Sequence, residues 1–412
     1  MPTHCPVFQE VFQRIRTTAT PQQLPYAACQ RLALLVTGIL AAKTTVVAQI
    51  AAELAALRLT HATQAESVAR RLRRTLNDPH LTPTVCYDPL LKQVIDWEQV
   101  LQGSRRVVVI LDESTKTDQI HLLRASLPYW GGSLPLAWEL WEQNVPLPEG
   151  EYWRRVERVL ARVAAQLPRG LEVVVVADEF FAIPGFVDRL ARYGWHWVLR
   201  VTPCGSHRFR DHRGHESGLG ERVRQQVRQP GQRWKARGAV FKDAGWYAAS
   251  VVAVWAAGTE EPVVLLSDQP PQWDVLRQYD RRFWCEPGFR TDKTRGWQWE
   301  ASQVQGVMHH AVLLLGMAWA SLVTLCLGVE EARARLAAAA ARPVRMGPRS
   351  GRPRHARESV FTLGLRQLRA WLYRTWQQPL RWRLPEVDAM SWYDRWHQQQ
   401  AQRLIFPPPV RP

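Results

Sequence analysis

Two aspartates that follow long apolar runs are the first residues whose position suggests chemistry. Asp112 comes after VVVIL, and Asp178 comes after VVVVA. Both runs predict buried strands, so each carboxylate is expected at a strand end, where an α/β sheet opens its ligand crevice. An unpaired buried charge is costly, so this placement favours a bound divalent cation. Many strands also end in Asp, and a purely structural role stays open for both residues.

A second group of polar residues follows at helical spacing. Steps of three, four and seven residues predict one shared helix face for Tyr279, Arg282, Glu286 and Lys293. An acid flanked by two cations and a phenol is poorly explained as a solvated surface. Beside a metal-held phosphate the arrangement makes sense, because the Glu completes the metal cage while the cations bind the phosphate backbone.

This spacing carries a family resemblance. The pattern Tyr-x-x-Arg-x-x-x-Glu, then six residues and a Lys, resembles the Y-R-E-K signature of DDE transposases of the insertion-sequence-four type. The order along the chain also fits, with Asp112 and Asp178 upstream and a β-rich insertion between Asp178 and Glu286. The resemblance covers roughly residues 105–328; it reaches the first hundred residues only through their helical character and hardly touches the C-terminal tail.

The resemblance implies a ribonuclease H-like core in which Asp112, Asp178 and Glu286 are the catalytic metal ligands for two Mg²⁺ or Mn²⁺ ions. In two-metal chemistry one ion activates a water or 3′-hydroxyl and the other stabilises the leaving oxygen. A member of this family nicks the ends of its own element, and the freed 3′-hydroxyl attacks the other strand or target DNA. Tyr279, Arg282 and Lys293 would then bind phosphates near the cut.

Aromatic residues add a second expectation drawn from the resemblance. Related transposases stabilise a base flipped out of the stack, and an aromatic residue directly follows the signature Arg; here these positions are Phe283 and Trp284. Aromatic stacking offsets part of the cost of unstacking a base. Trp234, Trp246 and Trp255 are further candidates, with core packing as the alternative for each of them.

Other acids compete for the metal-ligand role. Glu113 and Glu179 each adjoin a nominated Asp, and a register slip of one residue would turn them toward the site instead. Asp118 and Asp292 are weaker competitors. Pro287 directly follows Glu286 and lacks a backbone N–H, so a helix is expected to begin or kink there.

A loose group of possible zinc ligands lies further along the chain. Cys204, His207, His212 and His215 have some zinc-like spacing but match no firm template. A solvated basic loop is the favoured interpretation of this segment, with a structural zinc site as the alternative.

The charge balance points to a polyanionic partner. The 412 residues contain 54 Lys+Arg against 37 Asp+Glu, a formal net charge of +17. Nucleic acid is the partner that such an Arg-rich excess favours, although a solvated surface has the same composition. An Arg-studded predicted helix carries Arg70, Arg71, Arg73 and Arg74, which suits a helix-turn-helix type DNA reader or, equally, the exposed face of a bundle.

The predicted fold class is α/β, with a mixed-sheet ribonuclease H-like core, an N-terminal helical domain and a β-rich insertion. The expected domain boundaries are 1–100 for a helical, DNA-end-binding domain; 101–201 for the first part of the core; 202–261 for the insertion; 262–335 for the second part with the signature helix; and 336–412 for a basic linker and C-terminal helical region. Within the last, residues 342–357 hold six Arg and no acid.

The apolar run at residues 311–328 is as long as a membrane span, but its Gly, Ser and Thr content favours a buried core helix. The six cysteines show no C-x-x-C pair and indicate reduced intracellular thiols. With no apolar leader, the expectation is a cytoplasmic protein, nucleoid-associated when bound to DNA, with no membrane partner.

Taken together, these features predict an enzyme: a transposase that performs metal-dependent DNA cleavage and strand transfer. Its partners would be double-stranded DNA, as terminal inverted repeats and target, and a second copy of the chain in an active homodimer. The alternatives are a nuclease of the same fold without strand transfer and a catalytically inactive or domesticated DNA-binding derivative.

Overall fold

In the computed structural model, the described residues are 5–19, 23–59, 64–98, 105–117, 119–130, 132–202, 207–256, 258–340, 359–373 and 380–384. The chain begins with helices, whose apolar faces pack together into one part of the hydrophobic core. They are α1 (Pro6–Thr18), α2 (Tyr26–Ala42), α3 (Val47–Ala56), α4 (Ala65–Leu76), α5 (Pro83–Cys86) and α6 (Asp88–Val94).

The central sheet begins with an antiparallel meander and continues with parallel strands. Its first five strands are β1 (Arg106–Lys116), β2 (Ile120–Tyr129), β3 (Gly132–Glu142), β4 (Glu172–Ala177) and β5 (His196–Val201). They lie in the order β3-β2-β1-β4-β5, with β4 parallel to both β1 and β5. The valine-rich runs of β1 and β4 are buried on both faces, as expected for strands covered by helices on both sides.

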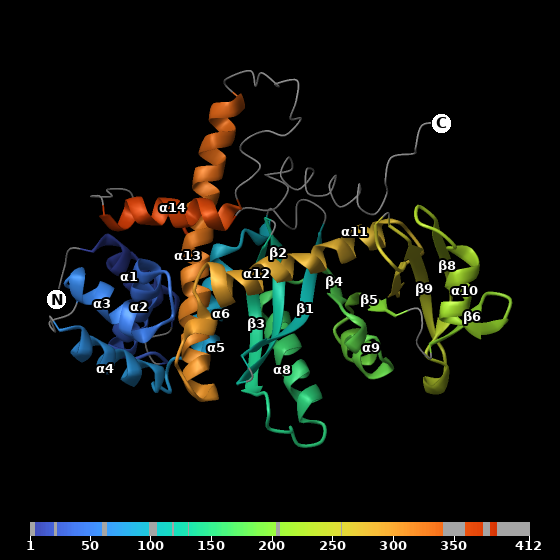
Figure 1. The fold of residues 1–412 in the computed structure, drawn as a ribbon, viewed down its shortest axis with the longest axis horizontal. Coiled ribbons are helices and arrows are strands. Elements are labelled where there is room, and N and C mark those ends of the chain that lie inside the picture. The colour runs from blue at the N-terminus through green and yellow to red at the C-terminus, as the bar shows by residue number, and fades with distance from the viewer. Residues whose placement is uncertain are drawn as a thin grey trace.

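The sheet is extended by antiparallel strands from later in the chain, in the order β10-β9-β8-β6-β7 beyond β5. These strands are β6 (Arg208–Asp211), β7 (Glu216–Gly218), β8 (Arg233–Val240), β9 (Tyr247–Val254) and β10 (Val263–Ser267), with α10 (Leu219–Gln226) and a short 3₁₀ turn, η2 (Lys242–Ala244), between them. In Figure 1 this β-rich part lies at the opposite end of the molecule from the N-terminal helices.

Helices cover both faces of the first strands. The connections within the parallel part are α8 (Glu151–Gln166), η1 (Glu179–Phe181) and α9 (Pro184–Ala191). The opposite face carries a broken helical segment: α11 (Asp274–Asp280), η3 (Arg281–Trp284), α12 (Cys285–Arg290), the π-helical turn η4 (Thr291–Arg295) and η5 (Trp299–Ala301). Figure 1 shows α11 and α12 crossing in front of the strands.

A long apolar helix, α13 (Val307–Ala340), runs between the N-terminal helices and the sheet, and α14 (Val360–Tyr373) crosses it (Figure 1). Within the described residues, its stretch Val307–Arg335 is the one helix that is apolar and long enough on its own to cross a membrane, and its most apolar window is entirely buried. The burial agrees with the core helix predicted from the sequence.

The predicted fold class is confirmed: the chain has a mixed α/β sheet, an N-terminal helical part and a β-rich insertion, consistent with a ribonuclease H-like core. One detail was wrong. Strand β1 does not end at Asp112 but continues to Lys116, because it stays paired with β2 after its pairing with β4 stops at Ile110. Asp118, Cys204 and residues 342–357 lie outside the described residues.

Candidate active site

The two nominated aspartates meet at one place on the sheet. Ile110 of β1 pairs with Val176 of β4, so two residues further on Asp112 and Asp178 occupy matching positions on neighbouring strands. Both carboxylates face Arg282, whose Nη2 lies 3.0 Å from Asp112 Oδ1 and 3.4 Å from Asp178 Oδ2. One guanidinium nitrogen therefore occupies the position between the two acids that a cation is expected to take.

The second oxygen of Asp112 is also engaged. The Cys285 thiol donates to Asp112 Oδ2 at 2.7 Å, and Asp112 Oδ1 accepts from the backbone N–H of Glu113 at 3.0 Å. Burial raises the pKa of Cys285 far above its usual range, and the adjacent carboxylate raises it further, so this thiol stays protonated.

Asp178 is partly protected from solvent and is electrostatically coupled to its neighbours. Burial raises its pKa; the Arg282 cation opposes that rise and the Asp112 carboxylate adds to it. Two neighbouring carboxylates that share one cation form a site in which positive charge is stabilising. Hard carboxylate oxygens are also the ligands that Mg²⁺ and Mn²⁺ prefer.

The signature residues are carried by the broken segment and not by one regular helix, so the single shared helix face predicted from their spacing is only partly formed. Tyr279 is buried in α11, and burial raises its pKa to about 12. Arg282 lies on η3, and Glu286 is exposed on α12. Lys293 lies in the π-helical turn and forms an ion pair with Glu300 at 3.6 Å.

The structure therefore brings together Asp112, Asp178 and Arg282, and the charges of all three shift the pKa of Tyr279. It does not bring Glu286 to the two aspartates. Within the part of the chain that the structure describes, no group of three or more His, Cys, Asp or Glu side chains is arranged to hold a metal ion. Two of the three predicted ligands share a cation-binding position, and the third lies on the adjoining helix.

The competing acids have other partners. Glu113 accepts hydrogen bonds from Tyr152 and, at 2.9 Å, from His121 on the opposite face of β1. Glu179 is exposed and accepts from Thr202. Asp292 is buried and forms an ion pair with Arg124 of β2. Each of these acids is thus engaged away from Arg282.

The aromatic candidates fall into two groups. Phe283 is 41% exposed and meets the Tyr279 ring edge-on, at a centroid distance of 5.9 Å, next to Trp284, which is half-buried. The three tryptophans of the insertion have partners there: Trp234 packs on Phe209, Trp246 lies under Arg210, and the Trp255 indole donates to the carbonyl of Thr259. Phe283 is therefore the most accessible of these rings.

The remaining sequence candidates lie away from the aspartates. On α4, the four arginines of the basic helix are exposed, and Arg73 pairs with Glu66 at 3.6 Å. His207 is partly buried, which lowers its pKa, whereas His212 and His215 are exposed. His215 faces Asp211 at 3.5 Å.

Two residues of the site were missed from the sequence. Cys285 adjoins Glu286, but a lone cysteine gives no signal of its own. Arg124 interrupts an otherwise buried strand in the stretch HLLRASL, and a charge inside such a run was the available sign that it has a buried partner.

Comparisons with known proteins support the transposase hypothesis in outline. No curated protein matches the sequence. A solved piggyBac transposase synaptic complex with hairpin DNA covers 98% of this chain and 84% of its own, at 10% identity and a TM-score of 0.39, which is too low to carry an argument. Residues 155–323 match the family model described as "Transposase DDE domain", a range that contains Asp178, Arg282 and Glu286 but not Asp112. This match supports a DDE-type transposase.

Proposed function

We infer that the chain is a DDE transposase that cuts DNA at the ends of its own mobile element and transfers the freed strand into target DNA. The observation that carries this proposal is the convergence of Asp112 and Asp178 on a single cation, Arg282 Nη2; Asp178 and Arg282 lie inside the range that matches the transposase DDE domain model. Two strand-borne carboxylates with a cation between them are suited to chemistry at phosphorus.

The metal ligands in this proposal are Asp112, Asp178 and Glu286, and the fit is strongest for the two aspartates. Two bound Mg²⁺ or Mn²⁺ ions would supply an activated water or 3′-hydroxyl and would stabilise the leaving oxygen. The chain's own residues position the DNA: Arg282 is released from the carboxylates to bind a phosphate, and Lys293 binds the backbone on the other side of Glu286. Glu286 is exposed on α12, so it faces solvent where DNA would approach.

The remaining parts of the proposal follow from the same hypothesis. Phe283 and Trp284 would stack on an unpaired base beside the cut. Arg70, Arg73 and Arg74 on α4 present an exposed basic row suited to the terminal repeat. The insertion-sequence-four subtype, a homodimer that holds both ends, and a cytoplasmic protein that joins the nucleoid when bound to DNA belong to this proposal as well.

The test is DNA cleavage with defined variants. Asp112→Ala, Asp178→Ala and Glu286→Ala are each expected to abolish Mg²⁺-dependent cleavage of a DNA duplex that carries the element's end, while binding of that duplex stays within about threefold. Full cleavage by all three variants would contradict the assignment. Cutting without joined products would favour the nuclease alternative, and salt-dependent binding without any cutting would favour the inactive derivative.

A further inference from the structure

The segment that carries Glu286 has a second set of residues on its sheet-facing side. Cys285, Gly288, Phe289 and Asp292 recur at steps of three, one and three residues, and all four are buried. The signature residues of the same segment are less buried: Arg282 is half-buried and Glu286 is exposed. We call the four buried residues the docking stripe.

The docking stripe rests on a row of side chains that crosses the sheet. Asp112, Arg124 and Trp138 are directly paired residues of β1, β2 and β3, so they share one face. Cys285 contacts Asp112, whereas the rest of the stripe meets Arg124. The docking stripe therefore touches the candidate ligand Asp112 and its cross-strand neighbour at the same time.

Arg124 contacts the remaining three residues of the stripe. Its guanidinium lies 4.1 Å from the centre of the Phe289 ring and forms an ion pair with Asp292. At Gly288 there is no room for a side chain: a Cβ would lie 2.1 Å from Ser133 Oγ and 3.1 Å from Arg124 Nη2. Glycine thus lets α12 approach the sheet closely enough for Arg124 to reach both neighbours.

The Arg124–Asp292 pair is buried and only partly hydrogen-bonded, an arrangement that is weak evidence for a gain in stability. Arg124 is 3% exposed and Asp292 7% exposed, and Arg124 Nε and Nη2 have no hydrogen-bond acceptor among the described residues. Burial raises the pKa of Asp292, and the Arg124 cation opposes that rise. Apolar residues of similar volume commonly replace such a buried pair without loss of stability.

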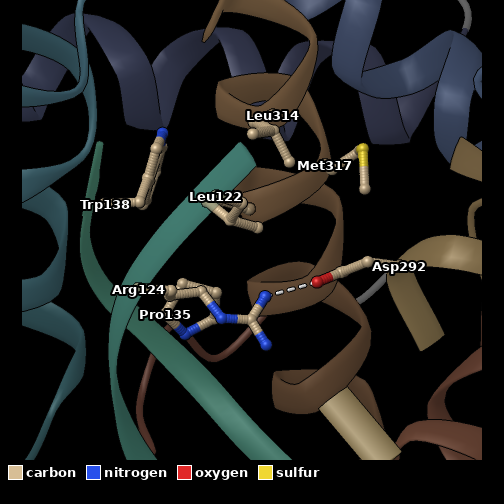
Figure 2. Close-up of a pocket in the computed structure, with 8 residues that line it drawn as sticks. Leu122, Arg124, Pro135, Trp138, Asp292, Leu314 and Met317 are labelled. Carbon is tan, nitrogen blue, oxygen red and sulfur yellow. Dashed lines mark hydrogen bonds and ion pairs between the residues drawn. The ribbon is translucent and has the colours of Figure 1, made fainter. Parts of the chain in front are cut away.

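A buried ion pair restricts the orientation of a helix more than apolar packing does. Apolar side chains pack acceptably at several rotations of a helix on a sheet, whereas an Arg and a carboxylate pair at one. Figure 2 shows the Arg124 guanidinium pointing from β2 to Asp292, with Leu314 and Met317 of α13 lining the same cavity of about 10 Å³.

We propose that Arg124 and Asp292 are positioning residues that set the rotation of α12 and so fix where Glu286 and Arg282 lie relative to Asp112 and Asp178. The inference rests on the proposed function, because its catalytic test requires that the chain cleaves DNA. A roll of the segment would shift Glu286 and draw Arg282 off the aspartates without unfolding the sheet. Loss of the pair is therefore expected to lower the rate of the chemical step and not DNA affinity.

The experiment replaces the pair with apolar residues and compares it with a matched pair elsewhere. Arg124→Met with Asp292→Leu removes both charges together, so neither is left alone. The control is Arg162→Met with Asp88→Leu: this pair joins α8 to α6 at 2.8 Å, and Arg162 also lies over Trp138 at 5.5 Å, but it touches no signature residue. Both double variants are expected to fold with similar melting temperatures.

Only the Arg124/Asp292 double variant is expected to lose kcat for Mg²⁺-dependent end cleavage, by about 10²-fold, with KM for the DNA within about threefold. Backbone amides at residues 285–295 are expected to exchange hydrogen faster in it. Wild-type kcat in the folded double variant overturns the proposal. If it fails to fold, Asp292→Asn takes its place: the amide oxygen still accepts from Arg124, so we expect a loss of about tenfold or less at unchanged KM, and no loss overturns it.

The two hypotheses fail separately. If the wild-type chain cleaves no DNA, the proposed function fails, and hydrogen exchange then decides the positioning inference alone. Unchanged exchange at residues 285–295 in the Arg124/Asp292 double variant overturns it, whereas faster exchange confined to that segment, and absent from the Arg162/Asp88 variant, supports it.

Discussion

Asp112 and Glu113 are neighbouring carboxylates on opposite faces of β1, and their partners differ. Asp112 faces the segment with the signature residues, where Arg282 bridges it to Asp178 and Cys285 donates to its second oxygen. Glu113, one residue later, faces α8 and accepts hydrogen bonds from Tyr152 and His121. Strand alternation alone separates the two environments.

The partners of the two carboxylates indicate which of them is available for chemistry. Glu113 has a partner on each oxygen, and its His121 partner stacks on Trp141 at a centroid distance of 4.3 Å. This cluster ties β1, β2 and α8 together. Asp112 shares its cation, the Arg282 guanidinium, with a second acid, Asp178. We therefore expect the Glu113 face to contribute to stability and the Asp112 face to bind a charged group.

The largest expected effect tests this contrast directly. Asp112→Asn keeps the shape of the side chain but removes the charge, so metal-dependent end cleavage is expected to fall by about 10³-fold or more. Glu113→Gln, the same chemical change one residue away, is expected to lower cleavage by less than tenfold. Single-turnover cleavage of an end duplex measures both variants.

Equal losses in the two variants would break the comparison and would restore Glu113 as a candidate ligand. The urea-unfolding midpoint of each variant is the control, because a variant that is unfolded at the assay temperature loses activity for an unrelated reason.

The strands were predictable because their sequence signal is local. Continuous valine-rich runs before Asp112 and Asp178 are typical of strands buried on both faces, and both runs form such strands. The end of β1 was not predictable in the same way. It depends on pairing with β2, and the residues beyond Asp112 are polar, so they looked like the end of the strand.

The site was predictable only in part, because its geometry depends on more than the local sequence pattern. Steps of three and four residues presuppose a regular helix, but the segment changes to a 3₁₀ turn at Arg281 and to a π-helical turn at Thr291. The spacing therefore located the signature residues without giving their directions. Contacts such as that between Arg124 and Asp292 join residues far apart in the chain, and no local pattern reports them.

A smaller effect is expected on the stability of the Glu113 face. Tyr152→Phe removes the phenol that donates to Glu113 and leaves one carboxylate oxygen without that partner. We expect the free energy of unfolding to fall by about 1–2 kcal/mol, with kcat for end cleavage unchanged within about threefold. Urea denaturation and the cleavage assay measure the two quantities. A loss of kcat with no loss of stability would instead place Tyr152 in the reaction.

The smallest expected effect is a pH dependence on the same face. Burial, and then the Glu113 charge, raise the pKa of Tyr152 above its ordinary value of 10. Above pH 10 the phenol therefore ionises in the unfolded chain before it does so in the folded protein. The folded state then binds more protons than the unfolded chain, so its stability falls as the pH rises. The contribution of Tyr152 to stability is fully present below pH 10.

Between pH 9.5 and 11, Tyr152→Phe is expected to lose stability less steeply than wild type, by at most about 1.4 kcal/mol per pH unit. Glu113→Gln is expected to lie between the two, because it removes the Glu113 charge and leaves the burial of the phenol and the Asp178 charge in place. Parallel slopes for wild type and Tyr152→Phe in urea denaturation would mean that the folded protein does not hold the Tyr152 phenol protonated, and the contrast between the two sides of β1 would then rest on the cleavage data alone.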